Sequence, residues 1–358
     1  MPRPLKIIQA IDAGGWGGSE KVVVTLSNEL ANKGHNVSVW VRKNSRLIEY
    51  LNSNVKVKEI PFLNDYDPLT VACFYKALYE NDIVHVHLGR AAKLSGWASS
   101  LIPDKNVKKR LITHIHGMHR KKHYCHQHQA ICVSHNILSY VKKVMPWISN
   151  AVVIPNGISY PTSVEKIVPL ISRDPKIIQL GMLASFKEEK GHKDMLKILS
   201  ILLHDQGYRN IKLLLGGKGP LLNEIKKMSI ALGLDSNIEF LGEISPKKVF
   251  SFWKSVDIGC FPSNKEGLSM SLLEAISVGC PIVAYDETGM TEILSDTNSL
   301  VQQGNIVMFA DFLKKIIDNP NKRLFLSSLL KKKIHNFSVT CMSDKTIEFY
   351  LKILRGFK

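Results

Sequence analysis

Residues 261–281 read FPSNKEGLSMSLLEAISVGCP and hold the densest structural and chemical signals of the chain. The apolar run at residues 257–261 has the length and the Gly/Pro flanks of a buried strand. Residues 262–265 predict a turn. Apolar positions with helical spacing resume near Ser269 and stop at residues 279–281, Gly-Cys-Pro, which is a helix-end signal. The stretch therefore predicts a strand, a loop and a helix in succession.

Two acidic residues bracket this loop and the start of the helix. Glu266 lies where the loop leaves the strand, and Glu274 follows after seven intervening residues. Between them, Gly267, Leu268 and Ser269 offer backbone N–H groups at a helix N-terminus. Such a terminus attracts phosphate because its amides are unpaired and its dipole end is positive. Carboxylates beside it can accept hydrogen bonds from sugar hydroxyls, so the loop predicts a nucleotide-sugar site.

The block resembles the E-x7-E signature of glycosyltransferase family 4, whose members are retaining enzymes with the two-domain GT-B architecture. The order Pro-Ser, Glu-Gly, Leu-Glu-Ala and Gly-x-Pro-Ile-Val-Ala within residues 262–284 is also similar to that family. Two glutamates eight residues apart also occur by chance, as a loop acid and a solvated helix face, so the whole context carries the resemblance. It implies that Glu274 grips the ribose diol and that Glu266 holds sugar hydroxyls and orients the anomeric carbon.

Length and composition limit the class of protein. A chain of 358 residues is too long for one core and suits two domains. No apolar run approaches the roughly 18 residues of a membrane-spanning helix. The first apolar run is closed by Asp12, which favours a strand over a signal peptide. The six cysteines lack CxxC pairing, as in a reduced cytoplasmic protein. We therefore expect a cytoplasmic location, with peripheral contact to the inner face of the plasma membrane.

The net charge of +17 is uneven along the chain. Residues 1–160 hold 21 Lys and Arg against 10 Asp and Glu, a net charge of +11, which indicates a surface that meets an anion. Lys121, Lys122, Lys142 and Lys143, with the apolar Trp147, suit an anionic membrane surface. The alternative is that Trp147 packs inward. A nucleic-acid-binding protein is the rival, but a recognisable aromatic and basic module is missing.

The first half of the chain alternates strand-like and helical segments, which predicts a parallel sheet covered by helices on both faces. A glycine-rich loop at residues 12–20 follows the strand at residues 5–11 and could approach a phosphate closely. The resemblance implies that the amide of Gly18 faces the donor diphosphate or the acceptor. It also implies that His116, in the segment Thr-His-Ile-His-Gly, contacts the transferred sugar. A tight turn and a satisfied turn histidine are the alternatives.

Residues 114–135 are rich in histidine, which raises the question of a metal site. They contain neither H-E-x-x-H nor a cysteine pair, so the spacing matches no zinc pattern. The interleaved residues Arg120, Lys121 and Lys122 better suit a basic loop on the acceptor side. We therefore expect no metal and no cofactor; the nucleoside-diphosphate sugar is the co-substrate.

The second half begins after a proline-containing segment. Residues 152–158, VVIPNGI, resemble the family's segment before the interdomain linker. Beyond the linker, the resemblance implies donor binding by Gly181, Lys187, Lys190 and Gly217, with Lys190 neutralising the diphosphate. Met182 stands where the family commonly has an arginine, and the chain thereby lacks a fork of phosphate donors.

The expected fold is α/β, with two Rossmann-like, doubly wound parallel-sheet domains facing a cleft, as in GT-B proteins. We expect an acceptor-binding domain at residues 1–158, a linker at 159–175, a donor-binding domain at 176–340 and a C-terminal helix at 341–358 that crosses back. The predicted function is a retaining glycosyltransferase that uses a nucleoside-diphosphate sugar, UDP-sugar favoured. The acceptor is a glycan or lipid-linked glycan in bacterial surface polysaccharide or lipopolysaccharide synthesis. A nucleotide-sugar epimerase of the same architecture is the alternative enzyme.

Overall fold

The protein is described here by a computed structural model covering residues 3–118, 121–160, 164–172 and 174–356. The chain divides into two compact units. The first comprises Met1–Ser159 with Phe337–Lys358, and the second comprises Tyr160–Asn336. Arg120 of the expected basic loop, and residues 161–163 and 173 of the expected linker, lie outside the described residues.

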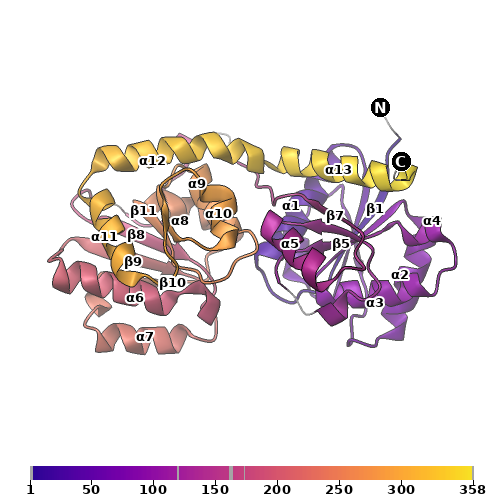
Figure 1. Ribbon diagram of the computed structural model, residues 1–358, viewed down its shortest axis with the longest axis horizontal. Coiled ribbons are helices and arrows are strands. Elements are labelled where there is room, and N and C mark those ends of the chain that lie inside the picture. Colours follow the sequence, from indigo (N-terminus) through magenta and orange to yellow (C-terminus); the bar gives the residue numbers. More distant parts are fainter. Residues whose placement is uncertain (1–2, 119–120, 161–163, 173, 357–358) are drawn as a thin grey trace. The chain divides into compact units, whose positions relative to one another are not determined.

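The first unit is built on a seven-stranded parallel sheet in the order β3-β2-β1-β4-β5-β6-β7 (Figure 1). Its central strands β1, β4 and β5 are buried on both faces apart from the first residue of β1, which is the pattern of a sheet covered by helices. The strands are β1 (Lys6–Ile11), β2 (Asn36–Val41), β3 (Lys56–Glu59), β4 (Ile83–His87), β5 (Leu111–Ile115), β6 (Gln129–Cys132) and β7 (Asn150–Val153).

Helices cover both faces of this first sheet. The helices α1 and α13 pack together on one face, and α2 and α3 pack together on the other (Figure 1). Helix α2 begins where its sequence predicts, because Asp67 caps it and Pro68 occupies its first turn. The helices are α1 (Gly18–Asn32), α2 (Pro68–Glu80), α3 (Gly89–Ser100), α4 (Lys105–Lys108), α5 (His135–Val144) and α13 (Val339–Arg355).

The second unit contains a six-stranded parallel sheet in the order β10-β9-β8-β11-β12-β13. Its strands are β8 (Ile178–Leu183), β9 (Ile211–Gly216), β10 (Ile238–Gly242), β11 (Ile258–Phe261), β12 (Ile282–Tyr285) and β13 (Leu300–Val301). Side chains from β8, β9 and β11 form one apolar core with those of α6 and α11. The expected linker residues 170–172 belong to the second unit. The Leu170 amide there donates a hydrogen bond to the Ser251 carbonyl at 2.9 Å.

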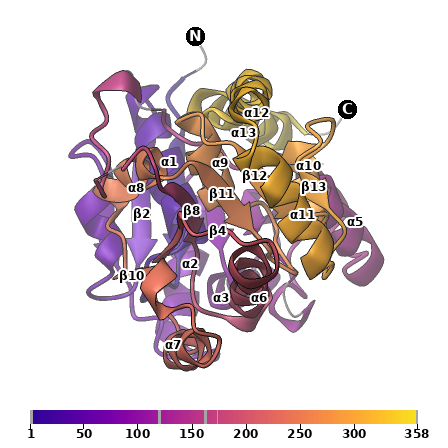
Figure 2. The same ribbon diagram turned by 90° about the vertical axis from the view of Figure 1, so that its left-hand side faces the viewer.

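The helices of the second unit also lie on both faces of its sheet. The pair α6 and α7 covers one face with α11, and α8 and α9 cover the other with α12 (Figure 2). They are α6 (His192–Ser200), α7 (Leu222–Ala231), α8 (Val249–Ser255), α9 (Met270–Ser277), α10 (Thr288–Leu294), α11 (Ile306–Ile317) and α12 (Pro320–Lys333). Helix α6 continues into a π-helical turn, Ile201–Asp205.

These two sheets confirm the predicted fold class of two Rossmann-like, parallel-sheet domains. Element types also agree with the sequence, while ends move by a few residues. The strands expected at residues 5–11 and 257–261 each begin one residue later, at Lys6 and Ile258. Within the described ranges, none of the helices combines the length and apolar character that crossing a bilayer requires.

The segment around Trp147 packs inward. The Trp147 indole N–H donates to the Tyr124 carbonyl at 2.8 Å, and Met145 and Ile148 are buried. Lys142 and Lys143 are exposed on α5. The inward-packing alternative is therefore the one that the structure shows, and these apolar groups do not form a surface for lipid.

Candidate functional site

The candidate donor site lies at one edge of the second sheet. All six strands are parallel, so the loops that follow β8, β9, β11 and β12 emerge at the same edge. Ligands of such sheets bind at the carboxyl ends of the strands. The predicted donor residues of the second unit lie in these loops, apart from Gly181 within β8 and Glu274 within α9.

An ion pair joins the loop after β8 to the loop after β11. Lys190 Nζ lies 2.6 Å from Glu266 Oε1, and their side chains are 20% and 12% exposed. Lys190 ends a short 3₁₀ turn, Glu188–Lys190. The Asn264 amide reinforces the link by donating to the Glu189 carbonyl at 2.8 Å. The structure thus brings together the predicted phosphate cation and the predicted sugar-binding carboxylate.

Three glycines allow these loops to approach one another. Gly191 has φ of +75°, and a Cβ there would lie 1.8 Å from the Pro262 carbonyl oxygen. Gly217 has φ of +138°, and its Cβ would lie 2.0 Å from the Ala184 carbonyl oxygen. A Cβ on Gly289 would lie 2.6 Å from that of Glu266. A side chain at any of these positions would push the loops apart.

Helix α9 begins beside the ion pair. Ser269 caps it, accepting a hydrogen bond from the Leu272 amide at 3.3 Å, and Ser271 Oγ donates to the Leu183 carbonyl at 2.7 Å. Gly267 and Leu268 precede the cap in the loop, and Glu274 lies on the helix with 6% of its surface exposed. The positive end of α9 is therefore fixed to the carboxyl end of β8.

Other predicted donor residues have different surroundings. Gly181 lies inside β8, where a Cβ would be 2.3 Å from Cγ2 of Val256. Lys187 is exposed just before the 3₁₀ turn. Met182 is only 2% exposed and belongs to the apolar core. Position 182 therefore presents no charge to this loop edge, and donor binding by Gly181 and Lys187 stays a prediction.

Gly18 and His116 belong to the first unit. Gly18 is the first residue of α1, and the preceding Gly17 provides no side-chain cap. Near this loop, Asp12 pairs with Arg42 at 2.9 Å and with Arg90 at 2.5 Å. The predicted helix N-terminus is thus present, with its first amides not capped by the preceding side chain.

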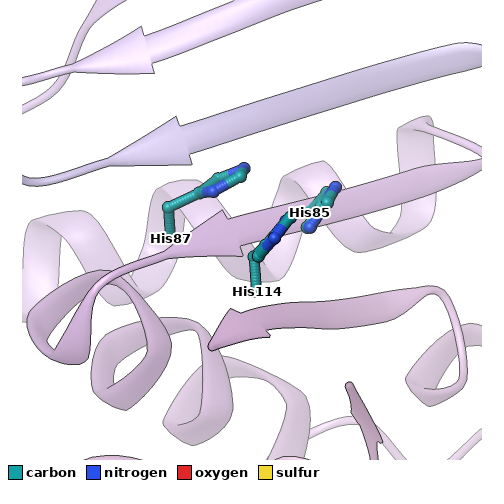
Figure 3. A group of neighbouring side chains, drawn as sticks. All are labelled: His85, His87 and His114. Carbon is teal, nitrogen blue, oxygen red and sulfur yellow. The ribbon is translucent and has the colours of Figure 1, made fainter. Parts of the chain in front are cut away.

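His116 lies at the end of a group of four histidines. His85 and His87 from β4 lie beside His114 from β5 (Figure 3). The rings of His114 and His116 face each other, with centroids 4.3 Å apart and planes 2° apart. Nδ1 of His87 lies 3.0 Å from Nε2 of His116. We call these four side chains the histidine stack.

Burial controls the charge of three members of the histidine stack. It lowers the pKa of His85 to about 3, with a smaller contribution from His116. It holds the pKa values of His87 and His114 well below the usual range for the same reason, because a buried cation loses its hydration. These three rings are therefore neutral at pH 7.

The ring nitrogens of His85, His87 and His114 lie close enough together to suggest a metal ion, within 4.8 Å of one another. Ring orientation argues against it. The planes of His85 and His114 differ by 6° and those of His87 and His114 by 24°. A metal ligand donates in the plane of its ring, and rings lying face to face do not direct their lone pairs at one point. These residues do not fit a metal centre.

Sequence reasoning missed His85 and His87 as neighbours of His116. Their spacing gave part of the signal, because residues two apart on a strand share a face of the sheet, but it does not say which strand lies next to theirs. It also missed Tyr350, on α13, which bonds to His85 over 265 residues. A pairing at that sequence distance has no local signature.

Two family models match the chain. Residues 16–160 match the model described as Glycosyltransferase Family 4, and residues 165–332 match the one described as Glycosyl transferases group 1. Alpha-monoglucosyldiacylglycerol synthase of Streptococcus pneumoniae is 23% identical, over 91% of this chain and 80% of that protein. Capsular polysaccharide biosynthesis glycosyltransferase CapM of Staphylococcus aureus is 23% identical, over 49% of this chain and 46% of that protein.

The solved structures include a similar fold. HepE from Anabaena, in complex with UDP and glucose, superposes with a TM-score of 0.80 at 16% identity, covering 96% of this chain and 98% of that one. The two parallel Rossmann-like units and the two family matches together identify a glycosyltransferase of GT-B architecture. The chain belongs to glycosyltransferase family 4. Its relatives include bacterial enzymes named for glycolipid and polysaccharide synthesis.

Proposed function

We propose that this protein is a retaining glycosyltransferase that moves a sugar from a nucleoside-diphosphate sugar, with UDP-sugar favoured, to a glycan or lipid-linked glycan. The pathway would be bacterial surface polysaccharide or lipopolysaccharide synthesis. The observation that carries the proposal is the Lys190–Glu266 pair beside the start of α9. It combines a cation and helix amides for phosphate with a carboxylate for sugar hydroxyls.

The donor would lie along this edge with its diphosphate at the α9 N-terminus. Lys190 would be shared between Glu266 and a phosphate oxygen, so its charge would remain balanced as the donor binds. Breaking the bond between the anomeric carbon and the diphosphate places negative charge on the leaving oxygen. Fixed amides and a lysine stabilise that charge in place, and Glu274 would hold the ribose diol.

The acceptor would attack from the face that the diphosphate leaves. Its hydroxyl oxygen forms the new bond to the anomeric carbon, and its proton passes to a phosphate oxygen of the leaving group. His116 would contact the transferred sugar. The donor is favoured as UDP-sugar because the similar HepE structure contains UDP and glucose. A lipid-linked or glycan acceptor is supported by the names of the relatives.

Thermal unfolding with UDP, GDP, ADP and their sugars tests the donor, since a ligand that binds the folded state raises the melting temperature. We expect the largest rise with UDP or a UDP-sugar. Glu274→Ala should abolish most of this rise and increase the donor KM, while Lys227→Ala, an exposed residue of α7, serves as the control. An equal rise in Glu274→Ala and wild type would contradict the assignment.

The alternatives have their own assays. An epimerase would interconvert nucleotide-sugars when no acceptor is present, whereas a transferase needs the acceptor.

Contact with an anionic membrane surface is a further proposal, based on the excess positive charge of residues 1–160. A nucleic-acid-binding protein would show salt-dependent binding to DNA or RNA.

A further inference from the structure

A continuous hydrogen-bond chain connects α13 with His116 through the interior of the first unit. Tyr350 Oη lies 2.6 Å from His85 Nδ1 and accepts from Gln9 Nε2 at 3.0 Å. Gln9 Oε1 lies 2.7 Å from His87 Nε2, and His87 Nδ1 lies 3.0 Å from His116 Nε2. Gln9, His85, His87 and Tyr350 are all 0% exposed. Water therefore has little opportunity to rearrange the protons of this chain.

The donors and acceptors in the chain determine where its protons lie. An amide oxygen can only accept, so His87 Nε2 carries the hydrogen that Gln9 Oε1 receives. His87 is neutral and has only one N–H, so its Nδ1 must accept. The hydrogen between His87 and His116 therefore belongs to Nε2 of His116.

Tyr350 determines which way the Gln9 amide faces. Its hydroxyl oxygen receives the Gln9 N–H, and its own hydrogen can be donated to His85 Nδ1, 2.6 Å away, when that nitrogen carries no hydrogen. If the amide turned over, its nitrogen would face His87, and His87 Nε2 would become the acceptor. His87 Nδ1 would then carry the hydrogen and His116 Nε2 would receive it. Reversing Gln9 thus reverses the proton on His116.

We infer that Gln9, His87 and Tyr350 are positioning residues that keep a hydrogen of His116 on Nε2, where it is donated to His87 Nδ1. This bond commits Nε2 to His87 and holds the His116 ring in one orientation. The role of His116 at the transferred sugar rests on the proposed function. The position of the proton on its ring can be measured without any substrate.

The direct test is a long-range 1H–15N correlation spectrum of histidine side chains at pH 7.5, which separates the two neutral tautomers. In the wild-type protein, His116 and His87 should both carry the hydrogen on Nε2. His116 would be assigned from the spectrum of His116→Gln. A His116 ring whose only hydrogen lies on Nδ1 would overturn the inference.

Tyr350→Phe tests the origin of the effect. It removes the acceptor of the Gln9 N–H, and a buried N–H without a partner is costly, so the amide should turn toward His87 Nε2. We expect the signal of His116 to shift wholly or partly to the Nδ1–H tautomer. The matched control is Tyr285→Phe, which removes a buried tyrosine hydroxyl from the second unit, where it bonds to Asp194. An unchanged His116 tautomer in folded Tyr350→Phe would refute the role of Tyr350.

Kinetics extend the test to catalysis. Once a donor and acceptor are known, Tyr350→Phe should lower kcat by roughly ten- to a hundredfold, the usual effect of an outer group that orients a ligand. The donor KM should stay near the wild-type value, because Tyr350 belongs to the first unit. If His116 carries its hydrogen on Nε2 but the protein has no transferase activity, only the proposed function is refuted. If the enzyme is active but His116 carries its only hydrogen on Nδ1, only this inference is refuted.

Discussion

Acid should destabilise the first unit far more than its surface charge suggests, because of the histidine stack. His85, His87 and His114 are neutral in the folded state, since burial lowers the pKa of His85 to about 3 and the other two well below normal. In the unfolded chain each takes up a proton below its ordinary pKa of about 6.5. Stability conferred by these neutral rings is therefore complete above pH 7 and is lost progressively as the pH falls.

The size of the effect follows from proton linkage. Between pH 7 and pH 5, each histidine that is protonated only in the unfolded state lowers the free energy of unfolding by about 1.9 kcal/mol. The three together lower it by about 6 kcal/mol, which is comparable with the whole stability of many domains. The carboxyl groups of Asp65 and Asp67 also have lowered pKa values. The stability that they contribute is lost as the pH falls too, but only at more acidic pH.

Urea unfolding of the full chain at several pH values measures this loss. Trp253 is the one tryptophan of the second unit, so a Trp253→Phe background restricts tryptophan fluorescence to the first. His114→Leu should reduce the loss between pH 7 and pH 5 to about 4 kcal/mol, and His128→Gln, at an exposed position, should leave it unchanged. A first unit equally stable at pH 7 and pH 5 would refute the reasoning.

Three further predictions concern the loops and the basic surface. Lys190→Gln should raise the donor KM about tenfold or more, because charge-assisted bonds to phosphate are lost; steady-state kinetics that match wild type would contradict this. Gly191→Ala should lower the free energy of unfolding of the second unit by about 1–3 kcal/mol, because its φ of +75° and its contact with the Pro262 carbonyl disfavour a Cβ; urea unfolding followed through Trp253 measures it. Lys142→Glu with Lys143→Glu should weaken sedimentation with anionic liposomes relative to neutral ones, and equal sedimentation of variant and wild type would exclude α5 as the contact.

The features predicted best from the sequence are those set by residues close together in the chain. The strand, loop and helix around Glu266 could be read locally, because an apolar strand, a turn and a capped helix follow one another. The two parallel sheets followed from regular alternation of strands and helices. The ion pair with Lys190 could not be read in this way, since the partners lie 76 residues apart.

The histidine stack shows where sequence reasoning stopped. His114 and His116 attracted attention as part of a histidine-rich segment, yet their neighbours are His85 and His87 on the adjacent strand. Strand order brings these residues together, and the order of strands in a sheet is not encoded by any one segment. Met182 is a different case: the sequence alone showed that a cation is missing there, and the structure adds that its side chain packs in the apolar core.

The assignment of α13 to the first unit has a consequence for biosynthesis. Gln9 and Tyr350 bond to each other although 341 residues separate them. A ribosome therefore releases the entire second unit before it supplies the helix that closes the first. The unit whose synthesis starts first is completed last, and until then its nascent sheet exposes the face that carries Gln9 and His85, which α13 covers. A chain that stops before α13 would thus leave the first unit without the helix that supplies Tyr350.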